Sequence, residues 1–227
     1  MIKVYAARIT SFPIEHLDSI LSGLPEVRRA KLLRFRFLHD LLRGATGDLL
    51  IRAVLPRMLD CSADELEFGS NLHGKPILMG DDLNIGFNVS HSGDWVVLAA
   101  GSSGRIGIDI ERVNEMDLAT AKQFYTEDEY NFIMKHESAE ARLLRFFQIW
   151  TAKESYIKAM GQGLSIPLNI FSTVDGDRMA EKQLIGGEPW YFRPYSLEEG
   201  YLLTACADVP EFDSNVQICD IRSLVGL

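Results

Sequence analysis

The chain has 227 residues, enough for one large domain or for two small halves that pack together. Its 47% hydrophobic and 24% charged residues are typical of a globular protein and exclude a disordered, collagenous or coiled-coil chain. The formal net charge of −9 argues against binding of nucleic acid, or of an anionic membrane, by the surface as a whole.

The charge is unevenly distributed along the chain. Residues 26–57 carry eight basic side chains against three acidic ones, a net charge of +5 within an acidic protein. The eight basic residues are Arg28, Arg29, Lys31, Arg34, Arg36, Arg43, Arg52 and Arg57. This basic segment predicts a place for an anion.

The cysteines and the apolar runs indicate the compartment. Cys61, Cys206 and Cys219 are odd in number and lack metal-ligand spacing, which suits a reducing compartment and predicts a cytoplasmic protein. The N-terminus has no long apolar stretch and the chain has no run of 18 apolar residues, so we expect neither export nor membrane spanning.

In chain order, the first part of the sequence predicts a strand, three helices and a hairpin. Weak alternation marks a strand over 3–9, and helical spacing of apolar residues marks helices over 14–21 and 38–59, with a further helix opened by Pro25. Two apolar strands, 85–90 and 95–100, flank four turn residues, His91 to Asp94, which indicates a hairpin.

The second part predicts a strand over 106–111, helices over 118–124, 127–135 and 139–160, and strands over 170–174, 190–195 and 201–207. A helix, a loop and a strand follow one another at 49–68 and again at 150–171. This faint duplication predicts two halves with a site in the cleft between them.

The strand over 106–111 carries the first chemical motif. Alternation places its three isoleucines on one face and Gly107, Asp109 and Glu111 on the other. Two carboxylates on one rigid face suit Mg²⁺, which takes few protein ligands and completes its shell with water and phosphate oxygens. The alternative is a solvated strand face, where two like charges cost little.

The helix over 139–160 carries the second motif. Trp150, Glu154 and Lys158 follow one another at i, i+4 and i+8 and share one helical face, so Glu154 and Lys158 can address one ligand. The alternative is an ordinary Glu–Lys ion pair on a helix surface. The tryptophan on the same stripe favours the wall of a cleft.

Two short polar segments add donors. Asn88 to Gly93 ends a strand with small polar groups and an imidazole, all able to donate to phosphate oxygens; the alternatives are a plain turn or a Ser90–His91 nucleophile pair. The pair is the poorer interpretation, because adjacent strand residues point to opposite sides. Lys75, held extended by Pro76, either presents its cation rigidly or belongs to a simple turn.

Together these motifs resemble one known family. They are, in order, Gly-Lys-Pro at 74–76, Asn-Val-Ser-His-Ser at 88–92, Gly-Ile-Asp-Ile-Glu at 107–111 and Trp-Thr-Ala-Lys-Glu-Ser-Tyr-Ile-Lys-Ala at 150–159. In this order and at these intervals they resemble the 4′-phosphopantetheinyl transferases of the Sfp type. The resemblance implies an α+β fold in which two similar halves, residues 1–105 and 106–227, form a monomeric pseudo-dimer with the active site between them.

The resemblance also implies an activity. Enzymes of this family move phosphopantetheine from coenzyme A to a serine of an acyl or peptidyl carrier protein and release adenosine 3′,5′-bisphosphate. Asp109, Glu111 and Glu154 match the positions that hold Mg²⁺ in the family. Glu154 is in addition the expected general base, and Lys158 matches the lysine that contacts the phosphate under attack.

Further positions match residues that bind coenzyme A. Ser90, His91 and Lys75 match positions along the phosphates and the adenine, and Arg43 sits in a matching arginine position. For the 3′-phosphate we expect Arg28 and Lys31, with Arg29 as the alternative.

Two other hypotheses use the same residues. An Mg²⁺-dependent phosphohydrolase would employ these carboxylates on a nucleotide pyrophosphate with water as nucleophile. A binding module would hold coenzyme A without turnover, but binding alone needs no general base.

Overall fold

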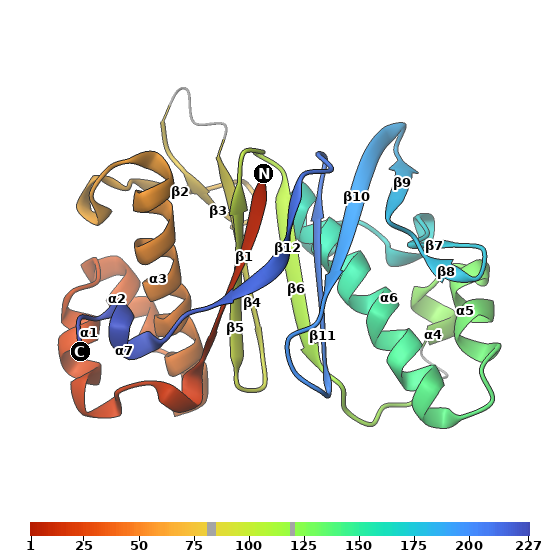
Figure 1. Cartoon of the computed structure of the whole chain (residues 1–227), viewed down its shortest axis with the longest axis horizontal. Helices are drawn as coiled ribbons and strands as arrows, with labels where there is room; N and C mark the ends of the chain where they lie inside the picture. Colours follow the sequence, from red (N-terminus) through yellow and green to blue (C-terminus); the bar gives the residue numbers. More distant parts are fainter. Residues whose placement is uncertain (81–84, 119–120) are drawn as a thin grey trace.

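A computed structural model describes residues 1–80, 85–118 and 121–227. The molecule has two β-sheets in its middle, with helices on the outer side of each (Figure 1). In Figure 1 the long helix α3 (Leu38–Leu59) covers one sheet and the long helix α6 (Ala139–Met160) covers the other. The α+β class expected from the sequence is confirmed.

The first sheet contains the first and the last strand of the chain. Its strands, in spatial order, are β12 (Phe212–Ile218), β1 (Ile2–Arg8), β5 (Trp95–Gly101) and β4 (Gly86–Ser92). β5 runs antiparallel to β1 and β4, whereas β12 runs parallel to β1. Every residue of β5 is buried, since α3 covers one face of this strand and the second sheet covers the other.

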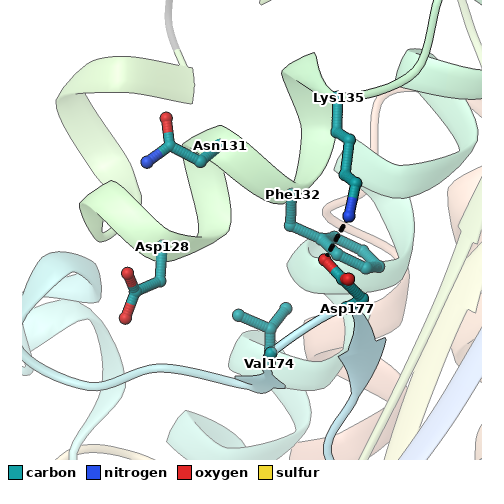
Figure 2. A pocket seen from close by; sticks show the side chains of 7 residues that line it. Asp128, Asn131, Phe132, Lys135, Val174 and Asp177 are labelled. Atoms are coloured by element: carbon teal, nitrogen blue, oxygen red, sulfur yellow. Dashed lines mark hydrogen bonds and ion pairs between the residues drawn. The ribbon is translucent and has the colours of Figure 1, made fainter.

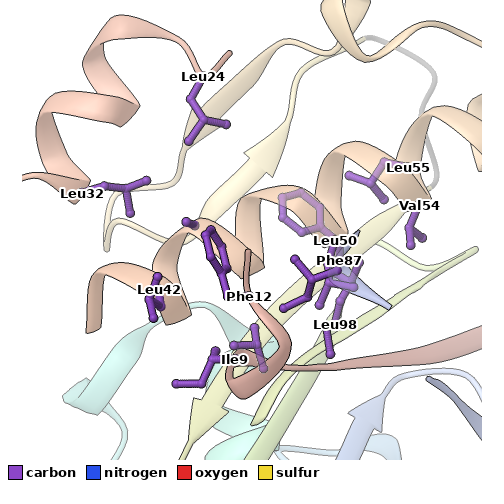
Figure 3. Close-up of a cluster of buried hydrophobic side chains, with 14 of the residues drawn as sticks. Ile9, Phe12, Leu24, Leu32, Leu42, Leu50, Val54, Leu55, Phe87 and Leu98 are labelled. Atoms are coloured by element: carbon purple, nitrogen blue, oxygen red, sulfur yellow. The ribbon is translucent and has the colours of Figure 1, made fainter. Parts of the chain in front are cut away.

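The core of the first half lies between α3 and the first sheet. Val96, Leu98 and Ala100 of β5 form one buried cluster with Leu42, Leu50 and Leu55 of α3. Figure 3 labels Leu98 and the three leucines of α3 in this cluster. The two glycines of α3 permit close packing on different sides: a Cβ at Gly47 would lie 3.3 Å from Val89 of the first sheet, and a Cβ at Gly44 would lie 2.5 Å from the Leu32 side chain. The helix continues through both glycines and through Pro56.

The second sheet is antiparallel throughout. Its strands, in spatial order, are β6 (Ile106–Arg112), β11 (Tyr201–Ala207), β10 (Glu188–Tyr195) and β9 (Lys182–Ile185). Helix α6 packs on its outer face through Ala152, Tyr156 and Ile157 against Trp190 and Phe192.

The inner faces of the two sheets pack on each other. Ile106, Ile108 and Ile110 of β6 are fully buried against Val97 and Ala99 of β5. The predicted alternation in β6 is thus confirmed: the isoleucines face the first sheet, and Gly107, Asp109 and Glu111 face α6.

The division at residues 105 and 106 falls between β5 and β6. After β11 the chain returns to the first half, where β12 pairs with β1 and the short helix α7 (Ile221–Leu224) packs near α3. Each sheet is covered by one long helix, and the C-terminal segment lies with the first sheet, not with the second. The expected bounds of the two halves stay a prediction.

The remaining elements are short. The helices are α1 (Leu17–Ser22), α2 (Glu26–Leu32), α4 (Ala121–Phe124) and α5 (Glu127–Met134). The two-stranded sheets are β2 (Phe68–Ser70) with β3 (Pro76–Leu78), and β7 (Val174–Asp175) with β8 (Arg178–Met179). In the described part of the chain no helix is both long and apolar enough to cross a membrane.

Three local predictions need correction. The helix expected over 14–21 begins with a 3₁₀ turn at residues 14–16, before α1. The strand expected over 170–174 is wrong up to residue 173, because residues 168–170 form another 3₁₀ turn and β7 begins only at Val174. Pro167 precedes that second turn. The β4–β5 hairpin turns at Gly93 and Asp94 alone, because β4 extends to Ser92 and Gly93 adopts φ +54°.

Residues 119–120 of the expected helix 118–124 lie outside the described residues.

Gly107 is the point where α6 lies closest to the second sheet. A Cβ there would overlap the backbone of α6 at Ser155 O and Ala159 N. We therefore expect Gly107→Ala to lower the free energy of unfolding by about 1–3 kcal/mol, as overpacking does. Urea unfolding measures this loss. Gly104→Ala is the matched control, since a Cβ at this exposed glycine meets no atom within 4 Å; equal stability of the two variants would contradict the prediction.

Candidate active site

The crossing of β6 and α6 brings the two sequence motifs together. Asp109 and Glu111 from β6 and Trp150, Glu154 and Lys158 from α6 line one open cavity of about 430 Å³. The cavity is closed on the third side by Val89, Ser90 and His91 of β4. The predicted helical stripe and strand face therefore form the walls of one cleft between the halves.

The polar side chains of β4 join the two halves at this cleft. Asn88 Oδ1, Ser90 Oγ and Ser92 Oγ accept hydrogen bonds from the backbone N–H groups of Ile108 (2.9 Å), Ile110 (3.4 Å) and Arg112 (3.0 Å). We call these three side chains the polar row. β6 is an edge strand of the second sheet, so the polar row takes the place of a neighbouring strand and satisfies its N–H groups.

The polar row also holds the carboxylates. Ser90 Oγ donates to Asp109 Oδ1 at 2.9 Å, and Ser92 Oγ donates to Glu111 Oε2 at 2.8 Å. Lys158 Nζ donates to Ser90 Oγ at 2.8 Å and to Asp109 Oδ1 at 2.5 Å. Lys158 thus forms its ion pair with Asp109, not the helix-surface pair with Glu154 that was the alternative.

The carboxylates repel one another. Burial raises the pKa of Asp109. Burial and the charge of Asp109 raise the pKa of Glu111. Burial also raises the pKa of Glu154, and the charges of Asp109 and Glu111 raise it further. With Lys158 as the cation among them, the cavity wall carries an excess of negative charge when all three are ionised.

The chemistry of these donors fits a divalent cation. Among the described residues no three His, Cys, Asp or Glu side chains stand as a ready metal cluster. Asp109 Oδ2, however, is buried without any hydrogen-bond partner, which is costly for a carboxylate oxygen. A cation held by this oxygen and its neighbours would satisfy it, and Mg²⁺ needs only one or two carboxylates when water and phosphate complete its shell.

A second cavity, of about 320 Å³, shares Glu154 and Lys158 with the first. Its other side is formed by Asn88 and by the turn from His73 to Pro76. Gly74 adopts φ +84° in this turn, and a side chain there would meet nothing. The ammonium of Lys75 does not extend into open space; it donates to the backbone carbonyls of Ile106 and Ala159.

His91 of the first half lines the first cavity, and Arg43 lies near it. Arg43 Nε donates to Gly93 O at 2.8 Å, and its guanidinium pairs with Asp40. Partial burial lowers the pKa of His91, and the charge of Arg43 lowers it further. His91 lies on the opposite face of β4 from Ser90, whose hydroxyl is committed to Asp109, so the geometry offers no Ser90–His91 nucleophile pair.

The remaining predicted residues lie elsewhere. Arg28 pairs with Asp48 on α3 at 2.7 Å, and Lys31 is exposed on α2 with its charge near the same carboxylate. Neither lines the two cavities. Their role toward a 3′-phosphate stays a prediction.

Other cavities lie in the second half. One of about 300 Å³ between α5 and the β7–β8 hairpin is lined by Asp128, Asn131 and Phe132 and crossed by the Lys135–Asp177 ion pair (Figure 2). Another, mostly apolar, lies beside α6 on the side of Thr151 and Ala152. Neither collects the carboxylates, lysine and hydroxyls found at the cleft.

Known proteins of one family are similar to this chain. A family model described as the 4′-phosphopantetheinyl transferase superfamily matches residues 105–206, and one described as the N-terminal part of 4′-phosphopantetheinyl transferase matches residues 13–103. The Sfp protein of Bacillus subtilis, named a 4′-phosphopantetheinyl transferase, is 32% identical over 213 residues, which cover 93% of this chain and 94% of the relative. The chain belongs to the 4′-phosphopantetheinyl transferase superfamily.

Further relatives of the transferase carry related names. The 4′-phosphopantetheinyl transferase gsp of Aneurinibacillus migulanus is 37% identical over 75% of this chain and 70% of its own length. A rat L-aminoadipate-semialdehyde dehydrogenase-phosphopantetheinyl transferase is 32% identical over 69% of this chain and 54% of its own length. The two family models divide the transferase between β5 and β6, where its two sheets are joined.

The sequence motifs did not predict a role for Lys153, a buried charge in the α6 motif. Lys153 is completely buried and pairs with Glu129 of α5 at 2.8 Å, and its Nζ also donates to Leu168 O and Phe171 O. Glu129 in turn accepts from Thr173 N and Oγ1. Burial lowers the pKa of Lys153, and the charge of Glu129 opposes this. A lysine within the apolar stripe of Ile149, Ala152 and Tyr156 was the available signal.

We predict that Lys153 supports the fold of the transferase. Lys153→Met leaves the Glu129 carboxylate buried without a cation, and should lower the free energy of unfolding by about 3–5 kcal/mol. The double variant Glu129→Gln/Lys153→Met should lose less than the single one, because no unpaired charge remains. The control is Lys135→Met at an exposed ion pair, with an expected loss below about 1 kcal/mol. Urea unfolding that ranked the double variant below the single one would refute this assignment.

Proposed function

We propose that the protein transfers phosphopantetheine from coenzyme A to a serine hydroxyl of a carrier protein in an Mg²⁺-dependent reaction. The observation that carries the proposal is the cleft in which Asp109, Glu111, Glu154 and Lys158 line one cavity between the halves. The relatives' names support the transferase over a phosphohydrolase with water as nucleophile.

In the proposed reaction the serine oxygen of the carrier forms a bond to the phosphorus that bears the pantetheine arm, and the bond from that phosphorus to the nucleotide phosphate breaks. Glu154 takes the serine proton, directly or through a water molecule. Burial and the charge of Asp109 raise the pKa of Glu154, which makes its carboxylate a stronger base than a solvated one. The leaving group is adenosine 3′,5′-bisphosphate.

Lys158 and the metal ligands stabilise the charge that develops in this step. Lys158 Nζ lies on the cavity wall between Ser90 and Asp109, where a cation offsets charge on the departing phosphate. Asp109, Glu111 and Glu154 would hold Mg²⁺, which when bound supplies positive charge to the pyrophosphate oxygens.

Coenzyme A would lie along the first-half wall. We assign its phosphates to Ser90, His91 and Arg43, and its adenine to the segment from His73 to Pro76, which includes Lys75 and lines the second cavity. Arg28 and Lys31 would reach the 3′-phosphate from the basic segment. Since both halves of the site come from one chain, we further propose a monomer; the free cysteines suit the cytoplasm.

The transfer itself can be tested directly. The protein is incubated with coenzyme A, Mg²⁺ and an apo carrier domain, and the intact mass of the carrier is measured. We expect the mass to rise by one phosphopantetheine group. Release of free 4′-phosphopantetheine without a carrier would instead favour the hydrolase, and binding without any product would favour the binding module.

Glu154→Gln tests the proposed base. The amide cannot accept the serine proton, so we expect transfer to slow by at least about 100-fold while coenzyme A binding largely persists. Glu140→Gln in the exposed first turn of the same helix is the matched control and should keep full activity. Wild-type turnover by Glu154→Gln would remove this residue from the role of base.

Mg²⁺ binding can be tested without turnover. Mg²⁺ at about 100 times its dissociation constant adds about 2.7 kcal/mol to folding stability, which should raise Tm by about 5–10 °C. The rise should shrink as pH falls, because protons compete for carboxyls whose pKa is raised at Asp109, Glu111 and Glu154. Glu111→Gln should reduce the rise, whereas Glu140→Gln should not. An equal rise in the absence of these carboxylates would argue against the site.

A further inference from the structure

The turn between β2 and β3, residues 71–75, reaches from the first half to the C-terminal end of α6. Asn71 Oδ1 accepts the backbone N–H groups of His73 and Lys75, both at 2.9 Å, and so shapes the turn. Asn71 Nδ2 donates outward to Gly161 O at 2.6 Å. Gly161 is the residue that ends α6.

Lys75 makes the second contact of this turn. Its Nζ donates to Ile106 O at 2.9 Å and to Ala159 O at 3.2 Å. The first carbonyl begins β6, and the second lies in the last turn of α6, where helix carbonyls lack partners within the helix and the dipole is negative. Burial lowers the pKa of Lys75 to about 8, as expected for an ammonium surrounded by protein.

The contact is close as well as polar. Gly161 adopts φ +66°, and a Cβ on it would lie 2.7 Å from Asn71 Nδ2 and 3.0 Å from Lys75 Cδ. The end of α6 therefore fits against the turn because residue 161 has no side chain. Lys158, which carries the proposed charge-stabilising ammonium, directly precedes Ala159 in this anchored turn.

We propose that Lys75 is a positioning residue: its ammonium ties the end of α6 to the start of β6 and thereby holds Lys158 against Ser90 and Asp109. The side chain acts through Lys158 and not by contact with coenzyme A, although the backbone of the same turn lines the second cavity. This inference rests on the proposed transferase reaction.

The competing assignment is that the Lys75 ammonium binds a phosphate of coenzyme A. The two assignments differ in what the loss of the ammonium changes. A phosphate ligand contributes to the dissociation constant of coenzyme A, whereas a residue that positions Lys158 contributes to kcat and loses its effect when Lys158 is absent.

The test measures kcat, KM and the calorimetric dissociation constant of coenzyme A for Lys75→Met, Lys158→Met and the double variant at saturating Mg²⁺. We expect Lys75→Met to lower kcat by about 10- to 100-fold, the range that a small misplacement of a reacting group causes. The dissociation constant of coenzyme A should stay close to that of the wild type. In the Lys158→Met background, Lys75→Met should cause little further loss.

Two more variants keep the test decisive. Gly161→Ala strains the positive φ at the end of α6 and pushes the turn away from this helix, but it leaves every charge in place. It should therefore also lower kcat with little change in coenzyme A affinity, even if Lys75→Met folds poorly. Lys182→Met removes an exposed lysine on the far strand β9 and should behave as wild type.

Three outcomes would overturn the proposal. These are a tenfold weaker coenzyme A affinity with unchanged kcat in Lys75→Met, fully additive losses in the double variant, or a Gly161→Ala enzyme with wild-type kcat. In each of them the wild type still transfers phosphopantetheine, so the proposed function stands. A wild type that modifies no carrier would remove both proposals together.

Discussion

The structure depends on one constraint: the free edge of β6 must be satisfied by side chains instead of by another strand. The polar row of β4 does this. It accepts hydrogen bonds of 2.9–3.4 Å from the N–H groups of every second residue of β6, from Ile108 to Arg112, and these bonds fix the register between the halves. The two serine hydroxyls of the row then donate to Asp109 and Glu111. The seam that joins the halves is therefore also the floor of the cleft.

The carboxylates of the cleft are close together and partly buried, an arrangement that costs folding free energy. Asp109 is 3% exposed and leaves one carboxylate oxygen without a partner, and its charge raises the pKa of Glu111 and of Glu154. Buried like charges are tolerated where the surrounding packing is strong, here the isoleucines of β6 on one side and α6 on the other. A divalent cation would satisfy the Asp109 oxygen that has no hydrogen-bond partner.

Hydrogen bonds between the halves fix the cleft at both of its ends. At one end the turn of residues 71–75 holds the last turn of α6. At the other end the β4–β5 turn lies between Arg43, which donates to Gly93 O, and Tyr201 of β11, whose hydroxyl accepts from Asp94 N at 3.1 Å. A side chain at Gly93 would overlap that tyrosine hydroxyl. The polar row lies between these two sets of contacts, which together fix its position relative to α6.

The sequence by itself determined the features that depend on local periodicity. The alternation in β6 placed Asp109 and Glu111 on one face, the i, i+4, i+8 spacing placed Trp150, Glu154 and Lys158 on one stripe, and the motif order indicated the family. Tertiary structure decided which partners these groups meet. Lys158 pairs with Asp109 and not with Glu154, and Arg28 pairs with Asp48. Lys75 and Lys153 donate to backbone carbonyls. All of these contacts depend on how elements that are distant in the chain cross. Periodicity fixes the direction of a side chain relative to its own helix or strand, whereas its partner depends on a neighbour that is remote in the chain.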